Sequence, residues 1–178
     1  MRKHKRTTGQ ALVEFAIAIT LIFLLLSASV DLGLIFFTMQ GLRNAAQEGA
    51  FFGSFPVVNV DSNGVPTGIS IRENEIRNRV RFESGARGIG IYDLRDLSED
   101  QIRISTLKDT NFDGYVSAGD PPCTQEDMLT ARHCYIRVEV LYDYNAFFPF
   151  APMLRDTVTL RASSILKIRS DMLLFRNS

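Results

Sequence analysis

One stretch of twelve residues carries oxygen-bearing side chains at the spacing of a calcium-binding loop. Residues 109–120 read Asp-Thr-Asn-Phe-Asp-Gly-Tyr-Val-Ser-Ala-Gly-Asp, and they differ from the calcium-loop template in ending with Asp instead of Glu. In such a loop, positions 1, 3, 5, 7, 9 and 12 supply oxygen ligands, while the glycine at position 6 permits a sharp turn. The sequence therefore predicts one structural calcium ion with these ligands: Asp109, Asn111, Asp113, the Tyr115 carbonyl, Ser117 and Asp120.

A second interpretation of this stretch stays open. Asp, Asn and Ser side chains also stabilise surface turns by accepting hydrogen bonds from nearby backbone groups, and this needs no ion. A predicted strand precedes the stretch and Pro121 and Pro122 follow it, so a regular helix on either side of the loop is not expected. The alternative to a calcium site is thus an Asx-rich surface turn.

The sequence offers little else for catalysis. It contains no GxSxG, HExxH, CxxC, P-loop or GxGxxG pattern, so the commonest nucleophile, metal and nucleotide signatures are missing. Nothing in it supports a hydrolase that works through carboxylates alone. We therefore expect a protein that is not an enzyme.

Charge is balanced overall but uneven along the chain. The 178 residues include 20 Lys and Arg and 20 Asp and Glu, which fits one folded domain and argues against a nucleic-acid partner held by bulk charge. Residues 1–9 contain four basic residues and no acid, so 16 basic and 20 acidic residues remain in the rest of the chain. This basic head directly precedes an apolar segment.

The apolar segment is long enough to cross a membrane. Of the 20 residues from Ala11 to Val30, all but Glu14, Thr20, Ser27 and Ser29 are apolar, and a helix of this length is about 30 Å long, the thickness of the hydrocarbon core. A cleaved secretory signal is the alternative, but the apolar pattern continues through residues 32–37. The positive-inside rule then predicts a single-pass protein of the cytoplasmic membrane, with residues 1–9 inside and everything after about residue 31 outside.

A carboxylate within such a segment is costly and calls for a reason. Glu14 lies five positions after Gly9, in the string Gly9-Gln10-Ala11-Leu12-Val13-Glu14-Phe15. This string resembles the cleavage signal of type IV prepilins, in which a membrane peptidase cuts after the glycine. The resemblance implies that Gln10 becomes the new N-terminus and that Glu14 serves assembly, as counter-charge to the α-ammonium of a neighbouring subunit. The alternative is a Glu that snorkels or stays protonated at the interface.

Two further strings narrow the resemblance. Val30-Asp31-Leu32-Gly33 and Leu42-Arg43-Asn44-Ala45-Ala46-Gln47-Glu48-Gly49-Ala50 are similar to those of the TadE-like minor pilins of tight-adherence (Tad, Flp-type) pilus systems. The resemblance implies a membrane-anchored minor pilin or pilus-assembly protein, with a pilin-like fold and assembly roles for Glu14 and Asp31. It also implies these partners: other pilin subunits, the assembly machinery, a prepilin peptidase and the lipid bilayer.

The two cysteines of the chain fall on the exported side of this topology. Cys123 and Cys134 are separated by 11 positions, and an oxidising compartment favours their pairing as a disulfide. Zinc would need more ligands, since His133 is the only histidine after the basic head. We expect the disulfide.

The elements that must position these residues follow from periodicity, and they predict an α+β fold. A transmembrane and stalk helix is expected over residues 10–53, followed by an extracytoplasmic head over 54–178 that begins with a turn-rich connection at 55–68. A second helix is expected over 70–84, with ion pairs from Glu73 to Arg77 and from Glu75 to Arg79. Strands of a small antiparallel sheet are expected at 101–107, 135–142 and 156–168.

A stripe of apolar and small residues along the long helix should pack against another element. Its members are Leu32, Ile35, Met39, Leu42, Ala46, Gly49 and Gly53. The small residues permit close approach of either the chain's own sheet or a neighbour's helix. Residues 144–154 are too apolar for an ordinary exposed loop, so they should either plug the core or form a docking surface.

Two functions from different classes remain. The first is the structural subunit that the resemblance implies, processed after Gly9 and assembled through its N-terminal helix. The second is a membrane-tethered, calcium-dependent binding or adhesion module that never polymerises. Processing discriminates between them, because a simple tether has no use for a new N-terminus next to Glu14.

Overall fold

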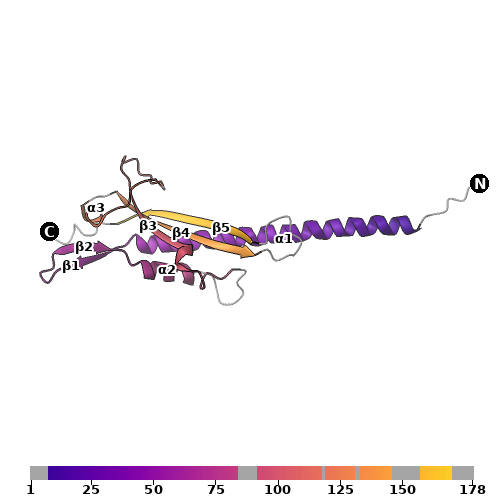
Figure 1. Cartoon of the computed structure of the whole chain (residues 1–178), viewed down its shortest axis with the longest axis horizontal. Helices are drawn as coiled ribbons and strands as arrows, with labels where there is room; N and C mark the ends of the chain where they lie inside the picture. The colour runs from indigo at the N-terminus through magenta and orange to yellow at the C-terminus, as the bar shows by residue number, and fades with distance from the viewer. Residues whose placement is uncertain (1–7, 84–91, 118, 131–132, 146–156, 170–178) are drawn as a thin grey trace, which may run out of the picture.

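The computed structural model describes residues 8–83, 92–117, 119–130, 133–145 and 157–169. One long helix, α1 (Thr8–Gly53), first runs free as a rod and then becomes part of a head built from strands and short helices (Figure 1). The predicted α+β fold, with a long N-terminal helix and a small antiparallel sheet, is confirmed.

The helix is continuous because no proline interrupts it. Its residues run from the apolar segment directly into the stripe of alternating three- and four-residue steps. It ends at Gly53, three residues before Pro56, whose ring cannot continue a helix. The last turn is closed by the amide of Ser54, which donates to the Ala50 carbonyl at 2.9 Å.

The head contains a three-stranded antiparallel sheet in the order β3 (Ile102–Lys108), β4 (Cys134–Asn145) and β5 (Thr157–Lys167). β4 lies in the centre, and its registers with β3 and β5 are regular over the full paired length. The predicted alternation holds, because Ile136, Val138 and Val140 are fully buried on one face of β4. All three strands lie where the pattern predicts them.

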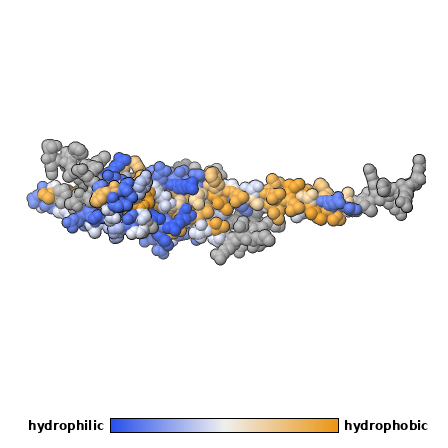
Figure 2. Space-filling model, turned by 90° about the horizontal axis from the view of Figure 1, so that it is seen from above, coloured by the Kyte–Doolittle hydropathy of each residue, from blue (hydrophilic) through white to orange (hydrophobic). Residues whose placement is uncertain are grey.

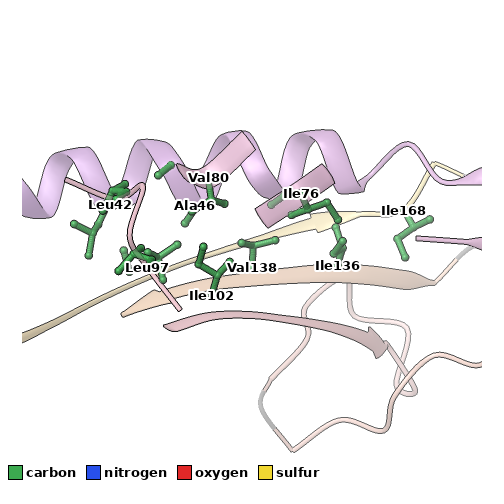
Figure 3. Packing of buried hydrophobic residues seen from close by; sticks show 14 of the residues in the cluster. Leu42, Ala46, Ile76, Val80, Leu97, Ile102, Ile136, Val138 and Ile168 are labelled. Atoms are coloured by element: carbon green, nitrogen blue, oxygen red, sulfur yellow. The ribbon is translucent and has the colours of Figure 1, made fainter. Parts of the chain in front are cut away.

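The core of the head lies between this sheet and two helices, α1 and α2 (Glu73–Phe82) (Figure 3). Leu42 and Ala46 of α1, Ile76 and Val80 of α2, and Val138 of β4 are among its buried members. A fragment that begins at residue 54 would lose one of these layers. The C-terminal half of α1 is therefore part of the head's folding unit.

The small residues of the α1 stripe face the chain's own head. A Cβ added at Gly49 would lie 2.6 Å from Val80 Cγ2, and one at Gly53 would overlap the Ile136 side chain. Close packing of the chain's own α2 and β4 thus accounts for both glycines. Of the two occupants expected for this stripe, the protein's own head is the one observed.

The predicted stripe is wrong at one residue, Leu32. Leu32 is 65% exposed, whereas its neighbour Asp31 is only 9% exposed. The buried face of the helix passes from Thr38 through Ile35 to Asp31, since these residues are spaced by three and four positions. Leu32 consequently lies on the side that the head leaves open.

The segment predicted as a turn-rich connection contains a β-hairpin. β1 (Val57–Val60) pairs with β2 (Pro66–Ser70), and Asp61 holds the turn by accepting the amides of Asn63 and Val65 through its side chain. Because Ser70 belongs to β2, the second helix starts at Glu73 and not at residue 70. Val57, Val58 and Val60 favour strand, and the Asn, Pro and Gly residues around them hid that pattern.

One of the two predicted ion pairs of α2 forms. Arg77 pairs with Glu73 at 3.0 Å, but Glu75 pairs with Arg72. Arg79 instead stacks on the ring of Phe52 in α1, 5.2 Å from its centroid. Arg72 makes both contacts, since it also lies over the Phe52 ring, 4.9 Å from its centroid.

The rest of the head consists of short elements. A 3-10 turn, η1 (Glu99–Gln101), precedes β3, and α3 (Gln125–Thr130) lies between β3 and β4. Of the apolar segment 144–154, Tyr144 is buried at the end of β4, and residues 146–154 lie outside the described part of the chain.

Candidate functional site: the free helix and the 109–120 loop

The first half of α1 is an apolar rod with no cover from the rest of the protein. Apart from one half-buried serine, every side chain from Gly9 to Val30 is exposed, including Leu12, Phe15 and Phe23, each of them more than 60% exposed. Figure 2 shows the corresponding hydrophobic surface along the projecting helix. By length and composition this helix can cross a membrane, and burying such a surface in lipid or against other helices is strongly favourable.

The polar groups of the rod are satisfied within the helix. The hydroxyls of Thr20, Ser27 and Ser29 each donate to a backbone carbonyl three or four residues earlier, at 2.8–2.9 Å. This leaves Glu14 as the one charged side chain between Gly9 and Val30. No basic residue of the rod offsets the free-energy cost of placing the Glu14 carboxylate in an apolar environment.

The predicted processing residues lie together at the start of the helix. The Gln10 side-chain amide donates to Glu14 Oε1 at 3.2 Å, one helical turn away. Gly9 has nothing within 4 Å of a Cβ built on it, and Phe15 is exposed beside Glu14. Within the described part of the chain, nothing from the head covers this end of α1.

A comparison with protein families matches this helix. The family model for TadE-like protein covers residues 9–50, from the glycine before the rod almost to the end of α1. Residues 9–50 are a TadE-like segment. This similarity associates the segment with Tad pilus systems, and together with the apolar helix it fits a single-pass membrane protein. No curated protein and no solved structure matches the chain.

Asp31 marks the point where the TadE-like segment meets the head. Its carboxylate is buried, and Tyr144 at the end of β4 is 3% exposed. Burial of the Tyr144 hydroxyl raises its pKa, and the negative charge of Asp31 raises it further. The structure therefore places Asp31 against its own head, in contrast to Glu14, which is exposed on the rod and contacts Gln10 of the same helix.

The 109–120 loop is ordered by hydrogen bonds to its own backbone. Asp109, which is 1% exposed, accepts the amides of Phe112 and Gly114 at 2.7 and 2.9 Å, one on each carboxylate oxygen. Asp113 accepts the Tyr115 amide at 2.8 Å, and Asp120 accepts the Ser117 amide at 2.5 Å. These contacts are those of the alternative interpretation, an Asx-rich turn.

One feature of the loop also fits the calcium template. Gly114, at position 6, has φ +83°, the left-handed turn for which the template requires glycine. The hydroxyl of Tyr135 donates to the Gly114 carbonyl, and its pKa is raised by burial and by the charges of Asp109 and Asp113. The charges of Asp109 and Asp113 therefore both lie near the Tyr135 hydroxyl.

The predicted ligands do not form a coordination shell in this structure. Among the described residues, which include every predicted ligand, no group of three or more His, Cys, Asp or Glu side chains is placed to hold a metal ion. Asn111 donates to Asp113 Oδ2 at 2.8 Å, an arrangement in which its amide nitrogen and not its oxygen faces the carboxylate. Metal binding requires the Asn111 side chain to turn, so that its amide oxygen and not its nitrogen faces the ion.

The predicted disulfide is confirmed. Cys123 and Cys134 are bonded, with their Cα atoms 6.0 Å apart, and both are buried. The bond fixes the return of the chain after the loop to the first residue of β4. Beside it, the Lys108 amide donates to the Pro121 carbonyl and the Asp109 amide to that of His133.

Two open depressions occur on the described surface. One, of about 490 Å³, is lined by residues 71–75 and Arg77, and its two glutamates pair with Arg72 and Arg77. The other, of about 430 Å³, is lined by Asn44, Gln47, Glu48, Phe51, Glu83 and Leu166. Neither lining contains a nucleophile beside a general base, so we assign no reaction to them.

Sequence reasoning missed the apolar residues that stay exposed on α1 after the rod ends. Leu32, Phe36 and Phe37 all remain more than half exposed although the head has begun at Asp31. The apolar run 32–37 carries the signal, because it contains more apolar residues than one buried stripe of a helix can hold.

Proposed function

We propose that this protein is a minor pilin or pilus-assembly protein of a Tad-type pilus, processed after Gly9 and assembled through α1. One observation carries the proposal. The segment that matches the TadE-like family contains the half of α1 that projects, apolar and uncovered, from a folded head. A surface of this kind needs lipid before assembly and neighbouring helices afterwards.

Cleavage after Gly9 gives a role to the basic residues of segment 1–9 and to Glu14. Residues 1–9 hold the N-terminus in the cytoplasm by the positive-inside rule, and their removal lets the helix leave the bilayer without carrying four basic residues through it. The new α-ammonium of Gln10 then needs a counter-charge in an apolar setting, where an ion pair is far stronger than in water. Glu14 of an adjacent subunit provides it.

Exchange of lipid for neighbouring helices makes assembly feasible energetically. The rod is apolar in both settings, so little hydrophobic free energy separates the membrane pool from the filament. The charged pair near its start then decides the axial register between subunits. The disulfide and the sheet keep the head folded once it is outside the cytoplasm.

The experiment is incorporation of Glu14 variants into pili or assembly complexes. Glu14→Ala should insert into the membrane normally but fail to incorporate, and Glu14→Asp should restore part of the incorporation. Ser27→Ala is the matched control, since it removes another polar group of the rod and should incorporate like the unmodified chain. Normal incorporation of Glu14→Ala would remove the counter-charge role.

The alternative, a tethered module that does not polymerise, makes the opposite prediction about the N-terminus. A tether functions equally well with residues 1–9 attached, whereas the pilin mechanism requires their removal. The state of the N-terminus therefore separates the two functions.

The proposal includes one structural calcium ion in the 109–120 loop. Its support is the spacing of the ligands and the left-handed Gly114 at position 6. Each Asp109 oxygen already accepts one amide but keeps a second lone pair for an ion. We propose no catalytic role for this or any other site.

A further inference from the structure

The open face of α1, defined as Leu32, Gly33, Phe36 and Phe37, continues the apolar surface of the rod into the head. Leu32 and Phe36 are 65% and 66% exposed, and they are one helical turn apart. Figure 2 shows hydrophobic surface reappearing where the helix joins the head. Along the helix, the open face follows the exposed apolar residues Leu26 and Val30 of the rod, which are 57% and 47% exposed.

The chemistry of α1 changes abruptly at the end of this face. Beyond Phe37, the solvent side of the helix presents Arg43, Asn44 and Gln47, all of them exposed. The boundary between apolar and polar surface therefore lies after Phe37. This is about two helical turns beyond Asp31, the residue at which the head begins.

The length of the apolar surface matches the membrane if Glu14 stays at the edge of the hydrocarbon. A hydrocarbon core of about 30 Å takes about 20 residues, which places its far edge near Leu34 when counted from Phe15. Phe36 and Phe37 then fall in the headgroup layer, where aromatic side chains concentrate. Tyr92 of the head packs against Phe37, with ring centroids 6.0 Å apart.

The burial of Asp31 fits the same position. Counted from Glu14, Asp31 falls inside the hydrocarbon, where an exposed carboxylate would be costly. The head shields it, since Asp31 is 9% exposed beside the end of β4. A carboxylate in water would need no such cover.

From these observations we infer that the membrane-proximal end of the head is seated in the bilayer interface, with the open face of α1 in contact with lipid. The occupant of this face is the acyl-chain and headgroup boundary of the leaflet that the helix exits. The inference rests on the membrane insertion contained in the proposed function, and it adds the depth of the head and the orientation of the helix.

The chain offers a direct test because it contains no tryptophan. Three variants each place one tryptophan at an exposed phenylalanine of α1: Phe23→Trp in the rod, Phe36→Trp on the open face and Phe51→Trp beyond the polar boundary. Each full-length variant is placed singly in phosphatidylcholine nanodiscs whose acyl chains carry bromine, a collisional quencher, either near the headgroup or deep in the core.

The inference predicts a graded result. Phe23→Trp should lose most of its emission to deep bromine. Phe36→Trp should lose most of its emission to shallow bromine, and its emission maximum should lie at a shorter wavelength than that of tryptophan in water. Phe51→Trp is the matched control, about 22 Å further along the helix and on nearly the same side, and it should be unaffected. Leu32→Trp, one turn before Phe36, repeats the measurement with an independent substitution.

Three results would overturn the inference, and they differ in what else they affect. If Phe36→Trp and Leu32→Trp behave like Phe51→Trp while Phe23→Trp is quenched, the helix inserts but the head stands clear of the membrane. A blue-shifted but unquenched Phe36→Trp would show that protein, such as a second copy, covers this face. Absence of quenching at Phe23 as well would overturn the membrane insertion on which the inference rests.

Discussion

Val80 of α2 lies so close to Gly49 of α1 that a Cβ on this glycine would be 2.6 Å from Val80 Cγ2. Val138 and Ile76 close the same space at 3.3 and 3.4 Å. The contact joins the two helices and the sheet at one point, so the head tolerates no side chain there without a shift of its core.

Gly49→Ala should therefore destabilise the head by about 1–3 kcal/mol, the usual cost of overpacking a close-packed core. The measurement is the thermal melt of the full-length protein in detergent. Gly33→Ala is the control, because nothing lies within 4 Å of a Cβ at Gly33, and it should leave the melting temperature unchanged or raise it slightly. Equal melting temperatures for both variants would show that α1 and α2 do not pack as described.

The Cys123–Cys134 bond should protect both thiols in the exported protein. An alkylating reagent is expected to modify neither cysteine until a reductant is added. Reduction should lower the stability of the head by up to about 3 kcal/mol, because the bond closes a short loop in the unfolded chain. Alkylation of both thiols before reduction would contradict the bond.

The ion pair between Lys108 and Asp127 predicts a component of acid sensitivity. The hydrogen bond from Lys108, with further hydrogen bonds from Thr124, lowers the pKa of Asp127 to about 2. A carboxylate whose pKa is lower in the folded than in the unfolded state stabilises the fold above its unfolded pKa, near 4, and this stabilisation is lost as pH falls towards 2. Asp127→Asn should flatten the dependence of unfolding on pH between about 4 and 2.

Asp93 provides a matched control for that experiment. Its pKa is likewise lowered to about 2, through a hydrogen bond with Arg95, but the partners are two residues apart and exposed. Such a local pair also forms in the unfolded chain, so Asp93→Asn should change the acid dependence less than Asp127→Asn. A larger change for Asp93→Asn than for Asp127→Asn would show that the Lys108–Asp127 ion pair between β3 and α3 is not the acid-sensitive contact.

Calcium should raise the melting temperature of the full-length protein relative to a chelator. Loops of this type outside cells bind with dissociation constants of about 10⁻⁴–10⁻³ M, and calcium at tenfold over that value adds about 1.4 kcal/mol. Asp113→Asn should abolish the increment, and Asp61→Asn, which alters a turn carboxylate of the β1–β2 hairpin, should retain it. Superimposable melts with millimolar calcium and with chelator would identify the loop as an Asx-rich turn.

Local patterns were sufficient to predict most of the fold. The long helix follows from an uninterrupted apolar run, and the strands from alternation such as that of Ile136, Val138 and Val140. The pairing of Cys123 with Cys134 followed from the compartment and from the absence of other candidates. These signals are carried by residues that are near in sequence or few in number.

What could not be predicted depends on contacts between distant residues. The burial of Asp31 arises from the end of β4, more than 100 positions later, and nothing in its local sequence indicates this. Arg79 contacts the ring of Phe52, and Glu75 pairs with Arg72. Which of these contacts form depends on how α2 packs on α1. In the 109–120 loop, spacing identifies the ligand set but does not show whether the carboxylates serve an ion or their own backbone.

The central claim is that α1 is a processed assembly helix, and the mass of the mature chain tests it most directly. Intact-mass measurement of the protein from cells that carry the pilus system should show loss of residues 1–9, with Gln10 as the first residue. The same protein from cells without the prepilin peptidase should keep its full length. A full-length chain in both strains, or a cut beyond the rod, would contradict the account.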